Sequence, residues 1–111
     1  QGGSAGSSER RDEFPTVCGV AFEGKVHPHR CTAVDIYEGG KKTKTEVHFP
    51  DQVIRLRWQS ANKVAVHVEG METRHAEYKQ AGDDINWFLD DKTYFYTPDK
   101  ELAKKKLAEL K

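Results

Sequence analysis

Hydrophobic and polar residues alternate along most of the chain from residue 14 onward, with the period of two that is typical of half-buried β-strands. Between residues 52 and 58, for example, Ile54, Leu56 and Trp58 alternate with polar side chains. Residues that favour turns, such as the Gly-Gly pair at 39–40, separate these stretches. The pattern therefore predicts six to eight short strands, in segments 17–22, 31–37, 43–49, 52–58, 64–68, 73–78, 85–89 and 93–96.

Two details of this pattern make specific predictions about the second strand. Because proline cannot occupy a central strand, Pro28 leads us to interpret residues 26–29 as a loop. In the strand that follows, we expect Val34 and Ile36 to point into the core and Asp35 to point outward.

The period changes near the end of the chain, where the sequence predicts a helix over 98–110. Thr97 can cap this helix, Pro98 suits the first helical position, and Asp99 favours the positive end of the helix dipole. A helix this short is not stable alone, so we expect it to dock on the sheet. Its apolar residues form one stripe: Ala103, Leu107 and Leu110.

The expected fold is mainly β (α+β): an antiparallel meander, curled into a small barrel or sandwich, with one C-terminal helix. A length of 111 residues is enough for one core and too short for two. We assign residues 14–111 to this domain. Residues 1–13 are predicted to form a flexible tether, because Gln1–Ser8 contains no large apolar residue and residues 9–13 are all charged.

The two cysteines, Cys18 and Cys31, lie in segments predicted to be neighbouring strands. With only two thiols there is one possible pairing, and we expect a disulfide that stabilises the fold by about 3 kcal/mol. The alternative is a pair of free thiols in a reducing compartment. A disulfide in so short a chain indicates an exported protein.

The first residues add to that expectation. The chain does not begin with Met, from which we expect that an upstream segment has been removed. A Gly/Ser-rich tether resembles the segment that follows the lipid-carrying cysteine of bacterial lipoproteins, which implies a periplasmic or outer-membrane-anchored location, with possible lipid anchoring. A cloning linker is the alternative interpretation of Gln1–Ser8. The sequence does not determine the oligomeric state.

Candidate catalytic and metal-binding groups are sparse. The cluster His27, His29 and Cys31 contains ligand types that suit zinc or copper, and a metal site is the alternative hypothesis. Ser60 is the only serine outside the tether and does not lie in a nucleophile elbow, so we expect no enzyme activity. No cofactor motif is present, and a formal net charge of zero argues against nucleic-acid binding.

The leading hypothesis is a non-enzymatic protein-binding domain of the bacterial cell envelope, of the inhibitor, immunity or assembly type. Arginine with exposed aromatic residues is the composition of protein-interface hot spots, and the alternative is that Arg–Glu pairs across strands only make an outer face soluble. We interpret both tryptophans as core residues. In size and strand rhythm the chain is similar to small periplasmic lysozyme inhibitors, although residues 70–73 lack their Ser-Gly loop. The expected contact residues are Arg55, Arg57 and His67 on one face and Asp83, Asp84, Asp90 and Asp91 in loops.

Overall fold

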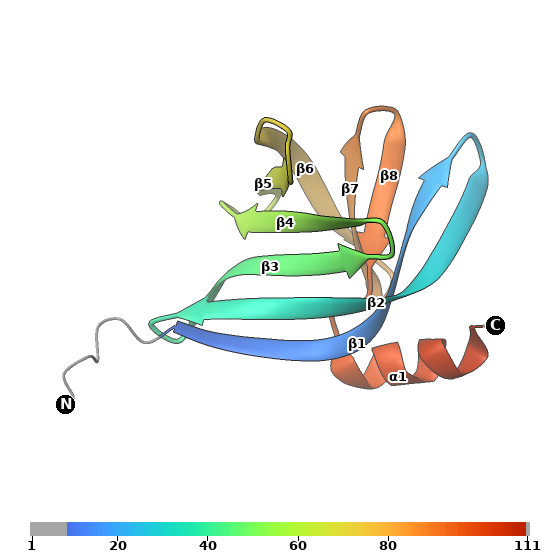
Figure 1. Cartoon of the computed structure of the whole chain (residues 1–111), viewed down its shortest axis with the longest axis horizontal. Helices are drawn as coiled ribbons and strands as arrows, with labels where there is room; N and C mark the ends of the chain where they lie inside the picture. The colour runs from blue at the N-terminus through green and yellow to red at the C-terminus, as the bar shows by residue number, and fades with distance from the viewer. Residues whose placement is uncertain (1–8, 111) are drawn as a thin grey trace.

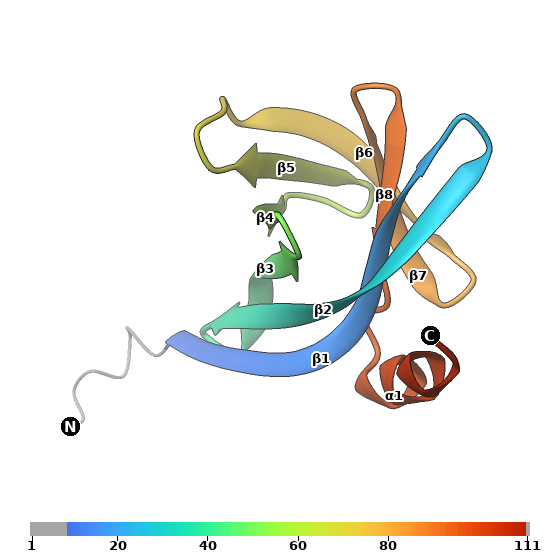
Figure 2. The same cartoon turned by 45° about the vertical axis from the view of Figure 1, so that its right-hand side comes forward.

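Eight antiparallel strands and one helix make up the computed structural model, which describes residues 9–110. Each strand pairs with its neighbours along the chain, and the last strand closes on the first to form a barrel (Figures 1 and 2). The predicted β meander with a terminal helix is therefore confirmed, and it takes the form of a barrel. The elements are β1 (Glu9–Phe22), β2 (Lys25–Glu38), β3 (Lys41–Phe49), β4 (Gln52–Trp58), β5 (Lys63–Val68), β6 (Arg74–Ala81), β7 (Asp84–Leu89), β8 (Lys92–Tyr96) and α1 (Lys100–Glu109).

Strand β1 begins earlier than the sequence predicted. Residues 9–13, assigned to the tether, pair with the end of β2, so that part of the prediction is wrong. Cross-strand contacts, and not an apolar pattern, hold these residues in the strand. Arg10 stacks on the Tyr37 ring at 4.1 Å, and Arg11 pairs with Glu46. Residues 1–8 of the predicted tether lie outside the described range.

The predicted loop at residues 26–29 is also wrong, because β2 runs without interruption through Pro28. Pro28 pairs with Gly19 on β1, whereas β3 joins the other side of β2 only from Thr32 onward. Pro28 therefore lies in an edge segment, where a missing N–H removes no ladder hydrogen bond.

Strand β2 has the opposite orientation to the one expected around Asp35. Asp35 points into the barrel and accepts a hydrogen bond from the buried Thr45 hydroxyl at 2.9 Å. Val34 and Ile36 lie on the outer face, yet they are only 4% and 3% exposed. Polar residues paired with them on both sides flank these two side chains: Glu13 and Glu46 for Val34, Arg11 and Lys44 for Ile36.

The barrel interior is filled by side chains from all eight strands. Trp87 and Tyr96 are the largest fully buried residues, and Trp58 packs against the same core at half burial. Trp87 stacks on Tyr94 with ring centroids 5.8 Å apart. Both tryptophans thus occupy core positions, as the alternation predicted.

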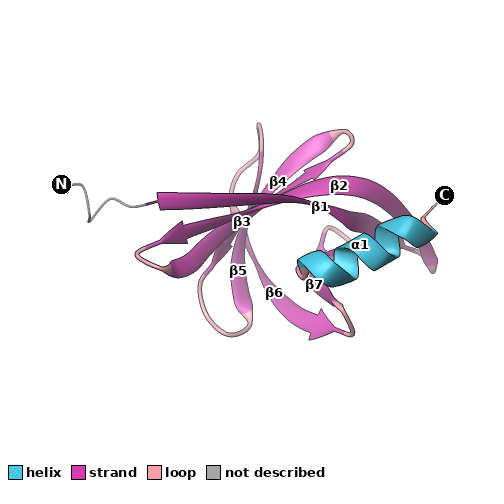
Figure 3. Ribbon diagram, turned by 90° about the horizontal axis from the view of Figure 1, so that it is seen from below, coloured by secondary structure: helices cyan, strands magenta, loops and turns pink. Residues whose placement is uncertain are grey.

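Helix α1 packs against β1, as Figure 3 shows from below. It is capped by Asp99, whose carboxylate accepts hydrogen bonds from the backbone N–H groups of Glu101 and Leu102. The prediction of Thr97 as cap and Pro98 as first residue is wrong. Thr97 is instead buried, and its carbonyl accepts a 2.6 Å hydrogen bond from Thr16.

Within residues 9–110, no helix is both long and apolar enough to cross a membrane.

Candidate functional site

The outer faces of β2 to β5, together with Thr73 just before β6, form an open groove of about 250 Å³. Ile36 and Ala65 are 3% and 7% exposed and supply its apolar floor. Strand pairing aligns Glu46, Arg55 and His67 in one row across β3, β4 and β5. The remaining lining residues are Lys44, Leu56, Arg57 and Thr73.

Glu46 is the centre of an ion-pair network in this groove. Its carboxylate lies 3.3 Å from Arg11, 3.5 Å from Arg55 and 3.2 Å from the His48 ring. Burial alone would raise the pKa of Glu46, but the His48 hydrogen bond and the two arginine charges outweigh it and lower that pKa. Arg55 also contacts Glu69 at 3.2 Å, so its guanidinium is held between two carboxylates.

Arg57 differs from Arg55 because it is exposed and makes no ion pair within residues 9–110. It lies between Lys44 and Ala65 in the register, next to the apolar floor. His67 also lines the groove, and its Nδ1 lies 3.2 Å from the Thr73 hydroxyl, within hydrogen-bond distance. The structure therefore brings together the three residues that the sequence singled out on one face, Arg55, Arg57 and His67.

The four aspartates proposed as contact residues lie on two different turns and not in this groove. Asp84 begins β7 and accepts hydrogen bonds from Thr97 and Lys106, both at 2.8 Å, which ties the helix to the barrel. Asp90 forms a bidentate pair with Arg74, which lowers the pKa of Asp90. Asp83 and Asp91 are exposed in the β6–β7 and β7–β8 turns.

The alternative metal site loses its sulfur ligand, because Cys31 forms a disulfide with Cys18. The predicted disulfide is thereby confirmed. His27 and His29 lie on the same face of β2, but the described part of the chain contains no group of three or more His, Cys, Asp or Glu side chains that could hold a metal ion.

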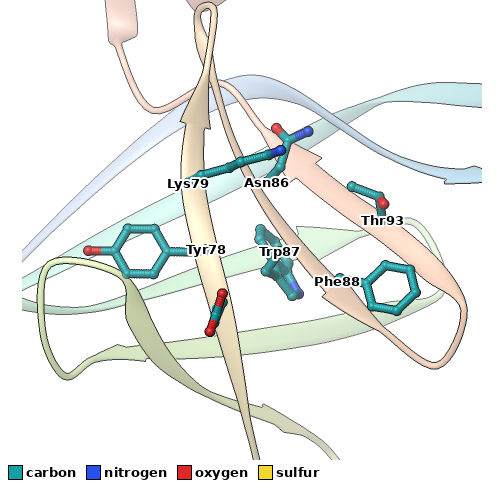
Figure 4. Close-up of a pocket in the computed structure, with 7 residues that line it drawn as sticks. Tyr78, Lys79, Asn86, Trp87, Phe88 and Thr93 are labelled. Atoms are coloured by element: carbon teal, nitrogen blue, oxygen red, sulfur yellow. The ribbon is translucent and has the colours of Figure 1, made fainter.

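A second hollow, of about 300 Å³, lies over β6, β7 and β8 (Figure 4). Strands β6 and β7 pair only between 78–81 and 84–87, so they separate beyond Trp87. Phe88 is 60% exposed at this hollow, and the Nε1 of buried Trp87 has no hydrogen-bond partner among residues 9–110. The sequence did not predict a site here, because the lining residues alternate between core and surface like those of any strand.

A chain of hydrogen bonds inside the barrel also escaped the sequence analysis. The Trp58 indole donates to the Thr45 hydroxyl at 3.0 Å, and that hydroxyl donates to Asp35. Burial raises the pKa of Asp35, although the charge of Lys42 and the Thr45 hydrogen bond oppose the rise. Tyr96 is fully buried nearby, and burial together with the Asp35 charge raises its pKa.

Comparisons of the chain with protein families, with curated proteins and with solved structures find no match.

Proposed function

We propose that this protein is a non-enzymatic protein-binding domain, and that the groove over β2 to β5 receives a carboxylate-bearing segment of its partner. The observation that supports the proposal is Arg57, an exposed guanidinium that makes no ion pair within residues 9–110 and lies beside an apolar floor. Arginine is enriched among the interface residues that dominate binding energy.

The charges in the groove favour an acidic partner. Arg55 is already neutralised by Glu46 and Glu69, so Arg57 is the guanidinium available for a new contact. A partner carboxylate can accept two parallel hydrogen bonds from an arginine, which gives both strength and orientation. Of the four aspartates, Asp84 and Asp90 serve internal contacts, which leaves Asp83 and Asp91 as candidate acidic contacts elsewhere.

The proposed setting is the bacterial cell envelope, where the domain would act on another exported protein as an inhibitor, immunity or assembly factor. The disulfide is compatible with an oxidising, exported location.

The test is capture of a partner from a bacterial envelope extract by the immobilised full chain. Wild-type protein is compared with Arg57→Glu, which reverses the charge at the proposed contact. The control variant is Lys104→Glu, which makes the same charge reversal on the exposed face of α1. The partner is identified by mass spectrometry, purified, and its affinity for each variant measured.

We expect wild type and Lys104→Glu to bind with similar affinity and Arg57→Glu to bind at least about tenfold more weakly. Equal binding by Arg57→Glu and wild type would place the contact surface elsewhere. The proposal would be refuted if no captured protein binds wild type and fails to bind Arg57→Glu.

A further inference from the structure

One mouth of the barrel opens between three chain reversals, the β1–β2 hairpin, the β3–β4 turn and the β7–β8 hairpin (Figure 1). It contains a pocket of about 500 Å³, which lies within the usual size range of small-molecule sites. The opening exists because β2 continues past the end of β3: residues 25–31 of β2 pair with β1 alone. Eight-stranded barrels that hold one small ligand hold it in such a mouth.

The walls of this mouth pocket are aromatic and apolar. Phe49 and Tyr94 meet edge to face with ring centroids 6.1 Å apart, and Val20 and Phe22 line the side formed by β1. Phe22 is 38% exposed although it is a large apolar residue on the inner face of the strand. A ring placed in this pocket would cover apolar surface that water now contacts.

Below the pocket the barrel is closed. One inner-face position deeper along β1 and β2 lie Cys18 and Cys31, whose disulfide joins the two strands and belongs to the packed core. Trp87 stacks on Tyr94 and fills the interior behind it. The pocket therefore accepts a small ligand at the mouth and not a long chain threaded through the barrel.

The polar groups of the pocket favour an anion. Lys92 lies with its Nζ 5.8 Å from the centroid of the Phe22 ring and makes no ion pair with any carboxylate within residues 9–110. His27 and His29 project from the inner face of β2 into the same lining. Asp51 is the one carboxylate among the lining residues. A ligand anion can thus pair with Lys92 while its ring contacts the aromatic wall.

We propose that the mouth pocket binds a small aromatic monoanion, such as an aryl carboxylate, with its ring against Phe22, Phe49 and Tyr94 and its anionic group at Lys92. This site is separate from the groove over β2 to β5. It shares no lining residue with that groove, so a result that refutes one proposal leaves the other unaffected.

The experiment titrates the ¹⁵N-labelled full chain with 2-naphthoate and follows backbone amide shifts by NMR. The matched ligand is 2-naphthylmethylammonium, which keeps the ring and reverses the charge. The matched protein variants are Lys92→Gln, which removes the proposed anion contact, and Lys79→Gln, which removes a lysine at the hollow over β6 to β8.

We expect saturable shifts confined to residues 20–29, 49–52 and 92–94, and weaker binding of the cationic ligand. Lys92→Gln should raise the dissociation constant for 2-naphthoate about fivefold, whereas Lys79→Gln should leave it unchanged. Unsaturated shifts up to the solubility limit, shifts located elsewhere, or equal binding of the two ligands would each overturn the proposal. An unchanged constant in Lys92→Gln would overturn the assignment of the anion contact.

Discussion

Reduction of the disulfide between Cys18 and Cys31 should remove a large part of the stability of the barrel. The bridge closes a loop with a sequence separation of 13 residues. In the chain-entropy description, such a cross-link stabilises the folded state by about 3 kcal/mol, because the unfolded chain loses conformational freedom. For a domain of this size each kcal/mol corresponds to about 4–8 °C in Tm, so the reduced protein should unfold about 12–24 °C lower.

The assay is thermal unfolding followed by circular dichroism, with oxidised and reduced protein compared at one pH. Cys18 is fully buried and Cys31 is 7% exposed, so the protein is reduced in denaturant and refolded with reductant present. Reduced wild type keeps both sulfur atoms in the core and isolates the cross-link. The double variant Cys18→Ala/Cys31→Ala adds the loss of packing and should be less stable still.

A Tm for the reduced protein within about 3 °C of the oxidised value would refute this reasoning. Such a result would mean that the unfolded chain retains part of the long β1–β2 pairing seen in the folded state. The cross-link would then remove little further conformational freedom from the unfolded chain.

Three further perturbations test the fold around the sites. Because burial raises the pKa of Asp35, the folded state keeps that proton to higher pH than the unfolded chain, and stability should fall as pH rises from about 4 through the native pKa. Asp35→Asn should reduce the pH dependence of the unfolding free energy, measured by urea unfolding at a series of pH values. The same pH dependence in Asp35→Asn and wild type would contradict the prediction. Gly19→Ala places a methyl group against the His27 carbonyl and 2.6 Å from the Phe95 ring, so it should lower the unfolding free energy by about 1–3 kcal/mol in the same assay. A stability equal to that of wild type would show that Phe95 and the β2 backbone move aside without cost. Asp99→Ala removes the helix cap and should cost about 1 kcal/mol, and no loss in Tm would mean that the cap is dispensable.

The sequence allowed the strand rhythm and the disulfide to be predicted because both depend on local information. A period of two identifies strands without knowledge of their partners, and two cysteines permit one pairing. The strand conformation of residues 9–13 and the inclusion of Pro28 in β2 depend instead on the pairing between β1 and β2 and on where β3 stops. Those features belong to the assembled sheet and leave no local signal.

The inverted orientation at Asp35 has a different cause. Alternation predicted that the larger apolar residues, Val34 and Ile36, point inward, but the inner positions of this part of β2 are the small Ala33 and the carboxylate of Asp35. A narrow barrel that also contains Trp58 and other large aromatic side chains has limited interior volume. The outer apolar residues are shielded by flanking polar side chains, a cover that alternation alone cannot reveal.

The groove could be predicted only in part. Alternation along β4 and β5 correctly placed Arg55, Arg57 and His67 on the outer face. The apolar floor formed by Ile36, and the neutralisation of Arg55 by Glu46, required the register between β2, β3 and β4. Register depends on turns and on the closed geometry, and so the distinction between a paired and an unpaired arginine emerges only from the three-dimensional structure.

The seam between β1 and β8 has a consequence for how the protein acquires its structure. The ladder between these two strands contains only four residue pairs within residues 9–110, from Cys18 with Tyr96 to Ala21 with Thr93. During synthesis, the hydrogen-bonding edge of β1 remains available to other nascent chains until β8 has emerged. Because this last contact spans most of the chain, its ring closure is entropically slow, and we expect premature association to compete with folding at high expression levels.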